Sequence, residues 1–105
     1  MKAWRHAPLL LLAAAAPGGK QIVLHGNGNG ALPCAACHGE NGQGKPSTGA
    51  PALAGKPASA IVSALNLMAA GQGGTPLMRS IAAALTLDER QQVAAYFSSL
   101  PKPSP

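Results

Sequence analysis

The sequence predicts a small all-α domain in which about three to four short helices are joined by broad loops. The chain has 105 residues, which is enough for one domain and too few for two. Apolar residues recur with helical spacing in several segments, whereas segments that resemble strands are nearly absent. The 13 glycines and 10 prolines interrupt any long helix. These three observations together favour short helices.

The first 16 residues are predicted to be a secretory signal peptide. Lys2 and Arg5 precede an unbroken apolar run at residues 9–16, and the small residues at its end suit a cleavage site. Cleavage after Ala16 and cleavage one residue earlier fit equally well, because Pro17 is unfavourable directly after a cut. The run is too short to span a bilayer, which takes about 20 apolar residues. An N-terminal helix that belongs to the fold and an uncut, weak anchor are the alternatives.

The charge pattern argues against a nucleic-acid partner. The whole chain carries 8 Lys and Arg against 3 Asp and Glu, a formal net charge of +5. Loss of Lys2 and Arg5 with the signal peptide leaves a mildly basic chain. Its basic residues are scattered, with neither a basic run nor interleaved aromatic residues.

The aromatic content predicts a core that the side chains alone fill poorly. Aromatic residues make up 3% of the chain, and Trp4 leaves with the predicted signal peptide, so that Tyr96 and Phe97 remain. A secreted chain of this size usually needs disulfides, a metal or a cofactor for stability. We therefore expect the many small residues to make room for such a group.

Two helices are predicted from apolar spacing. Residues 18–26 permit a short helix that the following Gly and Asn cluster ends. Pro57 suits the first turn of a second helix, and Gly71 ends it. The apolar residues that indicate these helices are Ile22, Val23, Ile61, Ala64, Leu65 and Met68.

A third helix has clear start and stop signals. Thr86 and Glu89 form a capping box at its beginning, and Pro101 ends it. One of its faces is apolar and consists of Val93, Phe97 and Leu100. The folded domain is therefore expected at residues 17–100, with residues 101–105 as a disordered tail.

The two cysteines of the chain lie in one short motif, Cys34-Ala35-Ala36-Cys37-His38. This pattern is typical of the covalent attachment of c-type haem. The spacing suits that chemistry because two thiols must reach the two vinyl groups on one edge of the porphyrin. The histidine that follows is then held beneath the ring with its imidazole directed at the iron.

Three other interpretations of the motif were weighed. A structural zinc site needs four ligands, and beyond the motif only His25 is available; adjacent Cys37 and His38 also fit one tetrahedron poorly. A dithiol redox pair needs a thioredoxin-like alternation of strands and helices, which is lacking. A disulfide that closes so short a loop stabilises little.

The sequence resembles the bacterial monohaem cytochromes c of class I over about residues 18–100. Beside the attachment motif, the resemblance rests on Asn41-Gly42-Gln43-Gly44, Pro51-Ala52-Leu53-Ala54-Gly55, Met78, and Val93-Ala94-Ala95-Tyr96-Phe97, in that order. It implies helices wrapped around one covalent haem c held by Cys34 and Cys37. It also implies that His38 and Met78 are the axial iron ligands, and that the Pro51 carbonyl accepts a hydrogen bond from the second ring nitrogen of His38.

The choice of the sixth ligand among the available side chains rests on position. Met68 falls on the apolar stripe of the second predicted helix, where a methionine usually fills the core. Met78 follows a glycine-rich loop at residues 71–76 that can wrap around the far face of the haem. We therefore prefer Met78, and His25 is the remaining alternative.

The expected function is periplasmic one-electron transfer and not catalysis. With both axial positions filled, the iron has no open site for substrate chemistry. Redox partner proteins that dock weakly and transiently are the expected partners, without nucleic acid and without stable membrane insertion after cleavage. One alternative is a haem c subunit of a periplasmic dehydrogenase complex. The other is a gas-binding or peroxide-reducing protein, which requires an open iron site.

Overall fold

The computed structural model describes residues 18–104, so the predicted signal peptide and its cleavage site lie outside the described residues. Within them five α-helices are present, and the one pairing of β type is an isolated bridge between Lys45 and Ala50. The prediction of an all-α fold is therefore confirmed. The helices are α2 (Gly19–His25), α3 (Ala35–His38), α4 (Ala58–Ala69), α5 (Pro76–Ala84) and α6 (Leu87–Ser99).

Two of these helices go beyond the three that the sequence indicated. The helix α3 is a single turn inside the cysteine motif. The helix α5 follows directly on the glycine-rich loop, and its N-cap Thr75 accepts a hydrogen bond from the backbone nitrogen of Met78 at 3.1 Å. Pro76 occupies the first turn, where its missing N–H costs nothing. These local signals begin a helix just where the glycines suggested a continuing loop.

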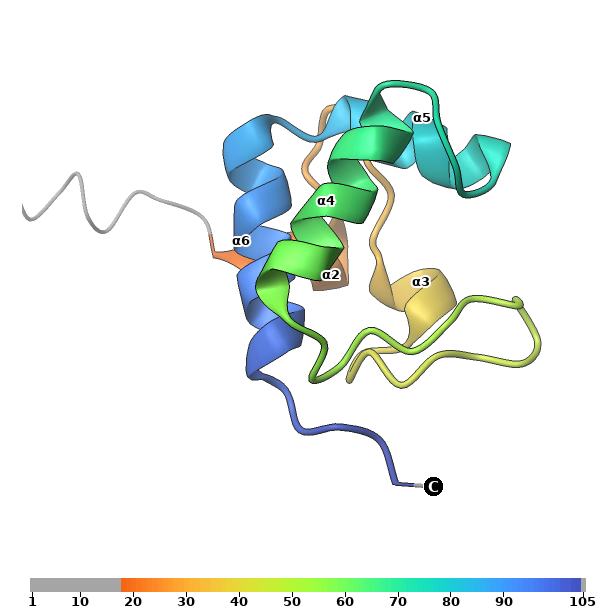
Figure 1. The fold of residues 1–105 in the computed structure, drawn as a ribbon, viewed down its shortest axis with the longest axis vertical. Helices are drawn as coiled ribbons and strands as arrows, with labels where there is room; N and C mark the ends of the chain where they lie inside the picture. Colours follow the sequence, from red (N-terminus) through yellow and green to blue (C-terminus); the bar gives the residue numbers. More distant parts are fainter. Residues whose placement is uncertain (1–17, 105) are drawn as a thin grey trace, which may run out of the picture.

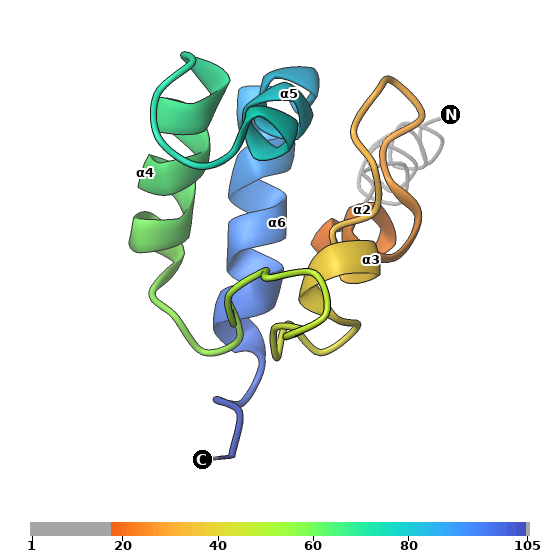
Figure 2. The ribbon, with the colours of Figure 1, turned by 90° about the vertical axis from the view of Figure 1, so that its right-hand side faces the viewer.

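The helix α6 is the element on which the others are arranged (Figures 1 and 2). The helices α2 and α4 both pack against it, α5 packs against α4, and α3 adjoins α2. Within residues 18–104, no comparable packing joins α5 to α2 or α3. Figure 1 shows α3 and α5 on the same side of the pair formed by α4 and α6.

The helix α6 begins and ends as the sequence predicted. The capping box is present: the Thr86 hydroxyl accepts from the Glu89 backbone nitrogen at 3.0 Å, and the Glu89 carboxylate accepts from the Thr86 nitrogen at 2.9 Å. The crossing of α2 and α6 is close at Gly19, where a side chain would collide with the Gln92 carbonyl oxygen. A glycine is therefore required for these two backbones to approach.

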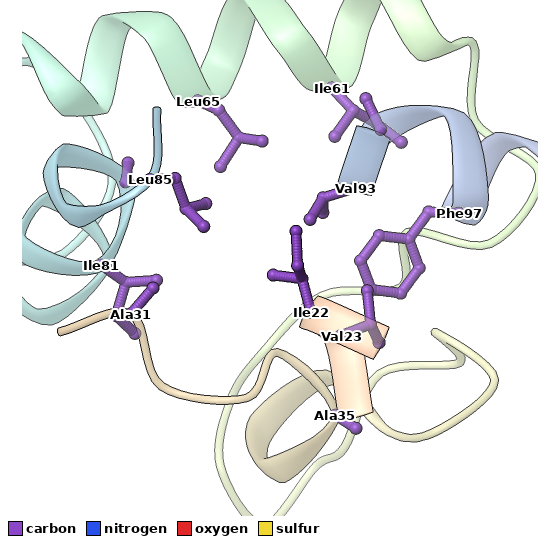
Figure 3. Packing of buried hydrophobic residues seen from close by; sticks show 12 residues of the cluster. Ile22, Val23, Ala31, Ala35, Ile61, Leu65, Ile81, Leu85, Val93 and Phe97 are labelled. Carbon is purple, nitrogen blue, oxygen red and sulfur yellow. The ribbon is translucent and has the colours of Figure 1, made fainter. Parts of the chain in front are cut away.

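The core lies among the inner faces of these helices. Figure 3 shows Leu65, Leu85, Ile22 and Val93 pointing toward one another from four different segments. Phe97 of α6 has no exposed surface. Burial of such apolar area is the main force that holds short helices together, since each is marginal in isolation.

The loop at residues 39–56 folds back beside α3. The Gly42 carbonyl accepts hydrogen bonds from the backbone nitrogens of Leu53 at 2.8 Å and Ala54 at 3.0 Å. The Gly44 nitrogen donates to the His38 carbonyl at 2.8 Å. These bonds tie the returning arm of the loop, which contains Pro51, to the segment that follows the cysteine motif.

Candidate haem site

The single turn of α3 gathers the cysteines and the histidine of the motif. The backbone nitrogens of Cys37 and His38 both donate to the Cys34 carbonyl, at 3.2 and 2.9 Å. Residues three and four positions apart lie on one face of a helix. The two thiols and the imidazole therefore share one face of α3, which is the arrangement that attachment along one porphyrin edge requires.

The imidazole of His38 is buried, with 6% of the residue exposed. Its Nδ1 nitrogen lies 2.8 Å from the carbonyl oxygen of Pro51. Since a carbonyl only accepts, Nδ1 carries the proton, and Nε2 keeps its lone pair for a metal. Among the described residues this is the one hydrogen bond of the ring. A carbonyl partner of this kind also fixes the ring orientation and raises the basicity of the ligating nitrogen.

The thiols of Cys34 and Cys37 are both free. Burial raises the pKa of the Cys34 thiol from 9.0 to about 11. A thiol exchange centre needs a thiolate near neutral pH, and this environment works against one. The raised pKa of Cys34 works against the dithiol interpretation of the motif, and the two cysteines are not joined in a disulfide.

The described part of the chain supplies no further ligand for a zinc ion at the cysteine motif. No group of three or more His, Cys, Asp or Glu side chains in residues 18–104 is placed to hold a metal ion. His25 is exposed at the end of α2. The motif therefore lacks the closed set of four ligands that structural zinc requires.

Met78 lies in the first turn of α5 and is half-buried. The loop before it is held by Arg79, whose Nη1 donates to the carbonyls of Gly73 at 2.7 Å and Gly74 at 3.2 Å. Hydrogen bonds from a charged donor are stronger than those between neutral groups. Thr75 and Arg79 therefore restrain the backbone directly before Met78.

Met68 of α4 lies beside the same loop. A side chain at Gly74 would collide with the Met68 sulfur and would lie 3.7 Å from Cβ of Met78. The structure thus brings the two candidate methionines to the same side of one glycine, which sequence spacing did not indicate. Met68 belongs to α4, which precedes the loop, and Met78 belongs to α5, which follows it.

The donor set and its surroundings fit a covalent haem. Two free thiols and an imidazole with an available Nε2 lie on one face of α3. Met78 belongs to α5, and Figure 1 shows α5 and α3 on the same side of α4 and α6. The hydrophobic cluster, which includes Cys34 and Met78 at its margin, supplies an apolar environment. In such surroundings a porphyrin is shielded from water.

Two residues near this site were not singled out from the sequence. Arg79 was counted only among scattered charges, although its position next to Met78 was a usable signal. Asn27 belongs to the Gly and Asn cluster that was expected only to end the first helix, and its partners lie 57 and 62 residues away. Nothing in the sequence indicates those partners.

No helix in residues 18–104 has the length and apolar character needed to cross a membrane.

Curated proteins similar to this chain include two bacterial ones. A thiosulfate dehydrogenase electron acceptor from Stutzerimonas stutzeri (strain A1501) is 38% identical over 98 residues, which cover 92% of this chain and 45% of that protein. Cytochrome c-552 from Acidithiobacillus ferridurans is 39% identical over 88 residues, covering 83% and 37%. The chain thus spans less than half the length of these relatives.

Solved structures show the same similarity. Thiosulfate dehydrogenase (TsdBA) from Marichromatium purpuratum superposes with a TM-score of 0.77 at 31% identity, over 82% of this chain and 19% of that one. Cytochrome c4 from Acidithiobacillus ferrooxidans has a TM-score of 0.72 at 37% identity, over 78% and 48%. The family model for cytochrome c matches residues 19–101. This chain therefore belongs to the cytochrome c family, which means that it is an electron-transfer protein with covalently bound haem c.

Proposed function

We propose that this chain is a periplasmic one-electron carrier in which Cys34 and Cys37 bind haem c and His38 and Met78 are the axial ligands. The observation that carries this proposal is the single turn of α3, with two thiols and one imidazole on one face. The hydrogen bond from His38 Nδ1 to the Pro51 carbonyl supports the assignment, since it leaves Nε2 available for iron.

The protein's contribution to electron transfer is to hold the ligands and to exclude water. Bound haem supplies the one-electron couple of its iron. A His and Met ligand pair favours the reduced state and raises the reduction potential. Occupation of both axial positions also excludes substrates from the iron, so this ligand set does not support oxygen or peroxide chemistry.

The covalent attachment is tested by producing the chain with the c-type maturation machinery present. Intact mass and a pyridine haemochrome spectrum should show one haem with two thioether bonds. Cys34→Ser and Cys37→Ser should each leave one thioether or none, which shifts the haemochrome band. A colourless product with the mass of the bare polypeptide contradicts the proposal. The mass also reports whether residues 1–16 are removed, and fractionation shows whether the protein is periplasmic.

The electron donor proposed for this carrier is a dehydrogenase that oxidises a small sulfur anion. The names of two relatives, each a thiosulfate dehydrogenase electron acceptor, support this donor class. In a stopped-flow experiment, ferric protein should be reduced by thiosulfate only when a thiosulfate dehydrogenase is present. Equal reduction by thiosulfate alone, or none with active enzyme, contradicts this donor.

A stable subunit of a dehydrogenase complex is the second candidate. The solved thiosulfate dehydrogenase favours this candidate. This chain matches only 19% of the chain in that structure, so the similar domain there is one part of a longer chain. Size-exclusion chromatography of the native protein separates the two candidates. A freely diffusing carrier elutes alone, whereas a subunit elutes with its catalytic partner.

A further inference from the structure

The side chain of Asn27 bridges two parts of the fold that are otherwise weakly connected. Its Nδ2 donates to the carbonyl oxygen of Ala84 at 2.8 Å and to Oε1 of Glu89 at 3.0 Å. Its Oδ1 accepts from the backbone nitrogens of Asn29 at 2.9 Å and Ala31 at 3.1 Å. Both donor hydrogens and both acceptor positions of the amide are therefore used.

One end of this bridge belongs to the segment that leads into the cysteine motif. The backbone nitrogen of Asn27 donates to the Ala31 carbonyl at 3.3 Å, in addition to the bond from Ala31 to its side chain. Ala31 is buried and lies three residues before Cys34. Because two residues separate Ala31 from Cys34, the position of Asn27 constrains where the attachment residues lie.

The other end of the bridge holds the helix that carries Met78. Ala84 is the last residue of α5, and Met78 lies six residues earlier on the same rigid element, about 9 Å along its axis. A substituent at Gly30 would contact Cβ of Ala84 at 3.4 Å, so the loop itself lies against this end of α5. Figure 2 shows the loop after α2 reaching the level of α5.

The packing of the helices makes this bridge important. The helix α5 packs on α4, whereas α3 adjoins α2, and both groups meet through α6. Arg90 adds one bond to α5, from Nη1 to the Ala82 carbonyl at 3.2 Å, but Arg90 belongs to α6. Among the side-chain hydrogen bonds of the described residues, the one from Asn27 to Ala84 joins α5 directly to the segment before α3. The bond to Glu89 ties the same segment to the start of α6.

We infer that Asn27 is a positioning residue for the sixth iron ligand. Its amide sets the separation between the attachment segment and α5, and so determines how firmly Met78 is held opposite His38. This inference rests on the proposed ligation by Met78. Loss of the bond to Ala84 lets α5 move on α4 and weakens the Met78 bond to iron, so that an external ligand displaces it more easily.

The experiment titrates imidazole into the ferric holoprotein and follows loss of the far-red absorption band of Met-ligated haem. The main variant is Asn27→Asp, which keeps Oδ1 as an acceptor for the loop, loses both donors and places a carboxylate beside Glu89. The double variant with Glu89→Gln removes this charge repulsion and should bind imidazole as tightly as Asn27→Asp. Asn27→Ala is the second variant, in case the first incorporates little haem. Both should bind imidazole about tenfold more tightly, since the bridge contributes roughly one to two hydrogen bonds. The reduction potential should fall in the same variants.

Three controls separate positioning from general stability. Asn29→Ala alters the same loop at an exposed side chain, and Ile61→Val destabilises the core of α4 away from the bridge. Both should leave imidazole affinity unchanged. Glu89→Gln keeps an acceptor for Asn27 and should stay within about twofold of the unaltered protein.

Two results overturn the inference in distinguishable ways. If the Asn27 variants lose thermal stability but bind imidazole like Ile61→Val, the role of Asn27 is structural only. If the unaltered protein lacks the far-red band and Met78→Ala changes nothing, the proposed ligand is wrong and the bridge has no sixth ligand to position.

Discussion

The Nδ1 nitrogen of His38 and the carbonyl oxygen of Pro51 lie 2.8 Å apart, although thirteen residues separate them in the chain. The backbone bonds from Leu53 and Ala54 to Gly42 hold the Pro51 arm in place. The orientation of the imidazole is thus set by the loop at residues 39–56. This relationship makes the loop part of the candidate haem site through a backbone carbonyl.

Replacement of His38 tests the proximal ligand. His38→Ala should abolish the low-spin holoprotein, because no other imidazole is held on the face of α3. Absorption spectroscopy and haem content per polypeptide measure this effect. The matched control is His25→Ala, which removes an exposed imidazole at the end of α2 and should leave the spectrum unchanged. A normal low-spin spectrum in His38→Ala contradicts the assignment.

Replacement of the two methionines tests the distal ligand. Met78→Ala should keep the covalent haem, lower the reduction potential and allow rapid carbon monoxide binding to the reduced protein. Met68→Ala should keep the spectrum and lower the free energy of unfolding by about 1–2 kcal/mol. That value is less than the ~2–5 kcal/mol of a fully buried methionine, since Met68 is half-buried. A spectral change in Met68→Ala alone would reverse the assignment.

Replacement of Gly42 tests the coupling between the loop and α6. A Cβ at this position would lie 2.7 Å from Cδ1 of Phe97, and the backbone φ is 65°. Gly42→Ala should therefore lower the free energy of unfolding by about 2–4 kcal/mol through overpacking and backbone strain. Gly49→Ala is the control, since φ is 76° there but no atom lies within 4 Å of the added methyl group.

Denaturant titration of the two glycine variants measures the difference. Gly49→Ala should cost only about 1–2 kcal/mol, the strain of a left-handed backbone conformation without a collision. Equal costs for the two substitutions would show that the approach of Phe97 to Gly42 contributes nothing to stability.

The carboxylate of Glu89 predicts a pH dependence of stability. Its hydrogen bonds from the Thr86 backbone and from Asn27 lower its pKa from 4.5 in the folded protein. The stability that results is fully present above 4.5 and is lost as the pH falls through the lower, folded-state pKa. The difference in Tm between the unaltered protein and Glu89→Gln should therefore shrink between about pH 6 and about pH 3. A constant difference over this range is inconsistent with the shifted carboxyl.

The features that the sequence predicted correctly are those that depend on neighbouring residues. The helix at residues 57–71 was recognised from the spacing of Ile61 and Leu65, and the capping box from Thr86 and Glu89. The cysteine motif was recognised for the same reason, since its residues are close together in the chain and fall within one turn of helix. The helix α5 was not predicted. The glycines before Thr75 indicated a loop, although Thr75 and Pro76 are typical of the start of a helix.

By itself, the sequence determined the all-α class, the three donors on α3 and the two methionines between which the distal ligand is chosen. Only the tertiary structure decided that Met68 and Met78 meet at Gly74 and that Asn27 joins Ala84 and Glu89. The physical reason is the range of the interactions. Backbone capping and helical spacing act within about four residues. A side-chain amide, in contrast, bonds whichever donors and acceptors the packing of distant helices brings within 3 Å or so.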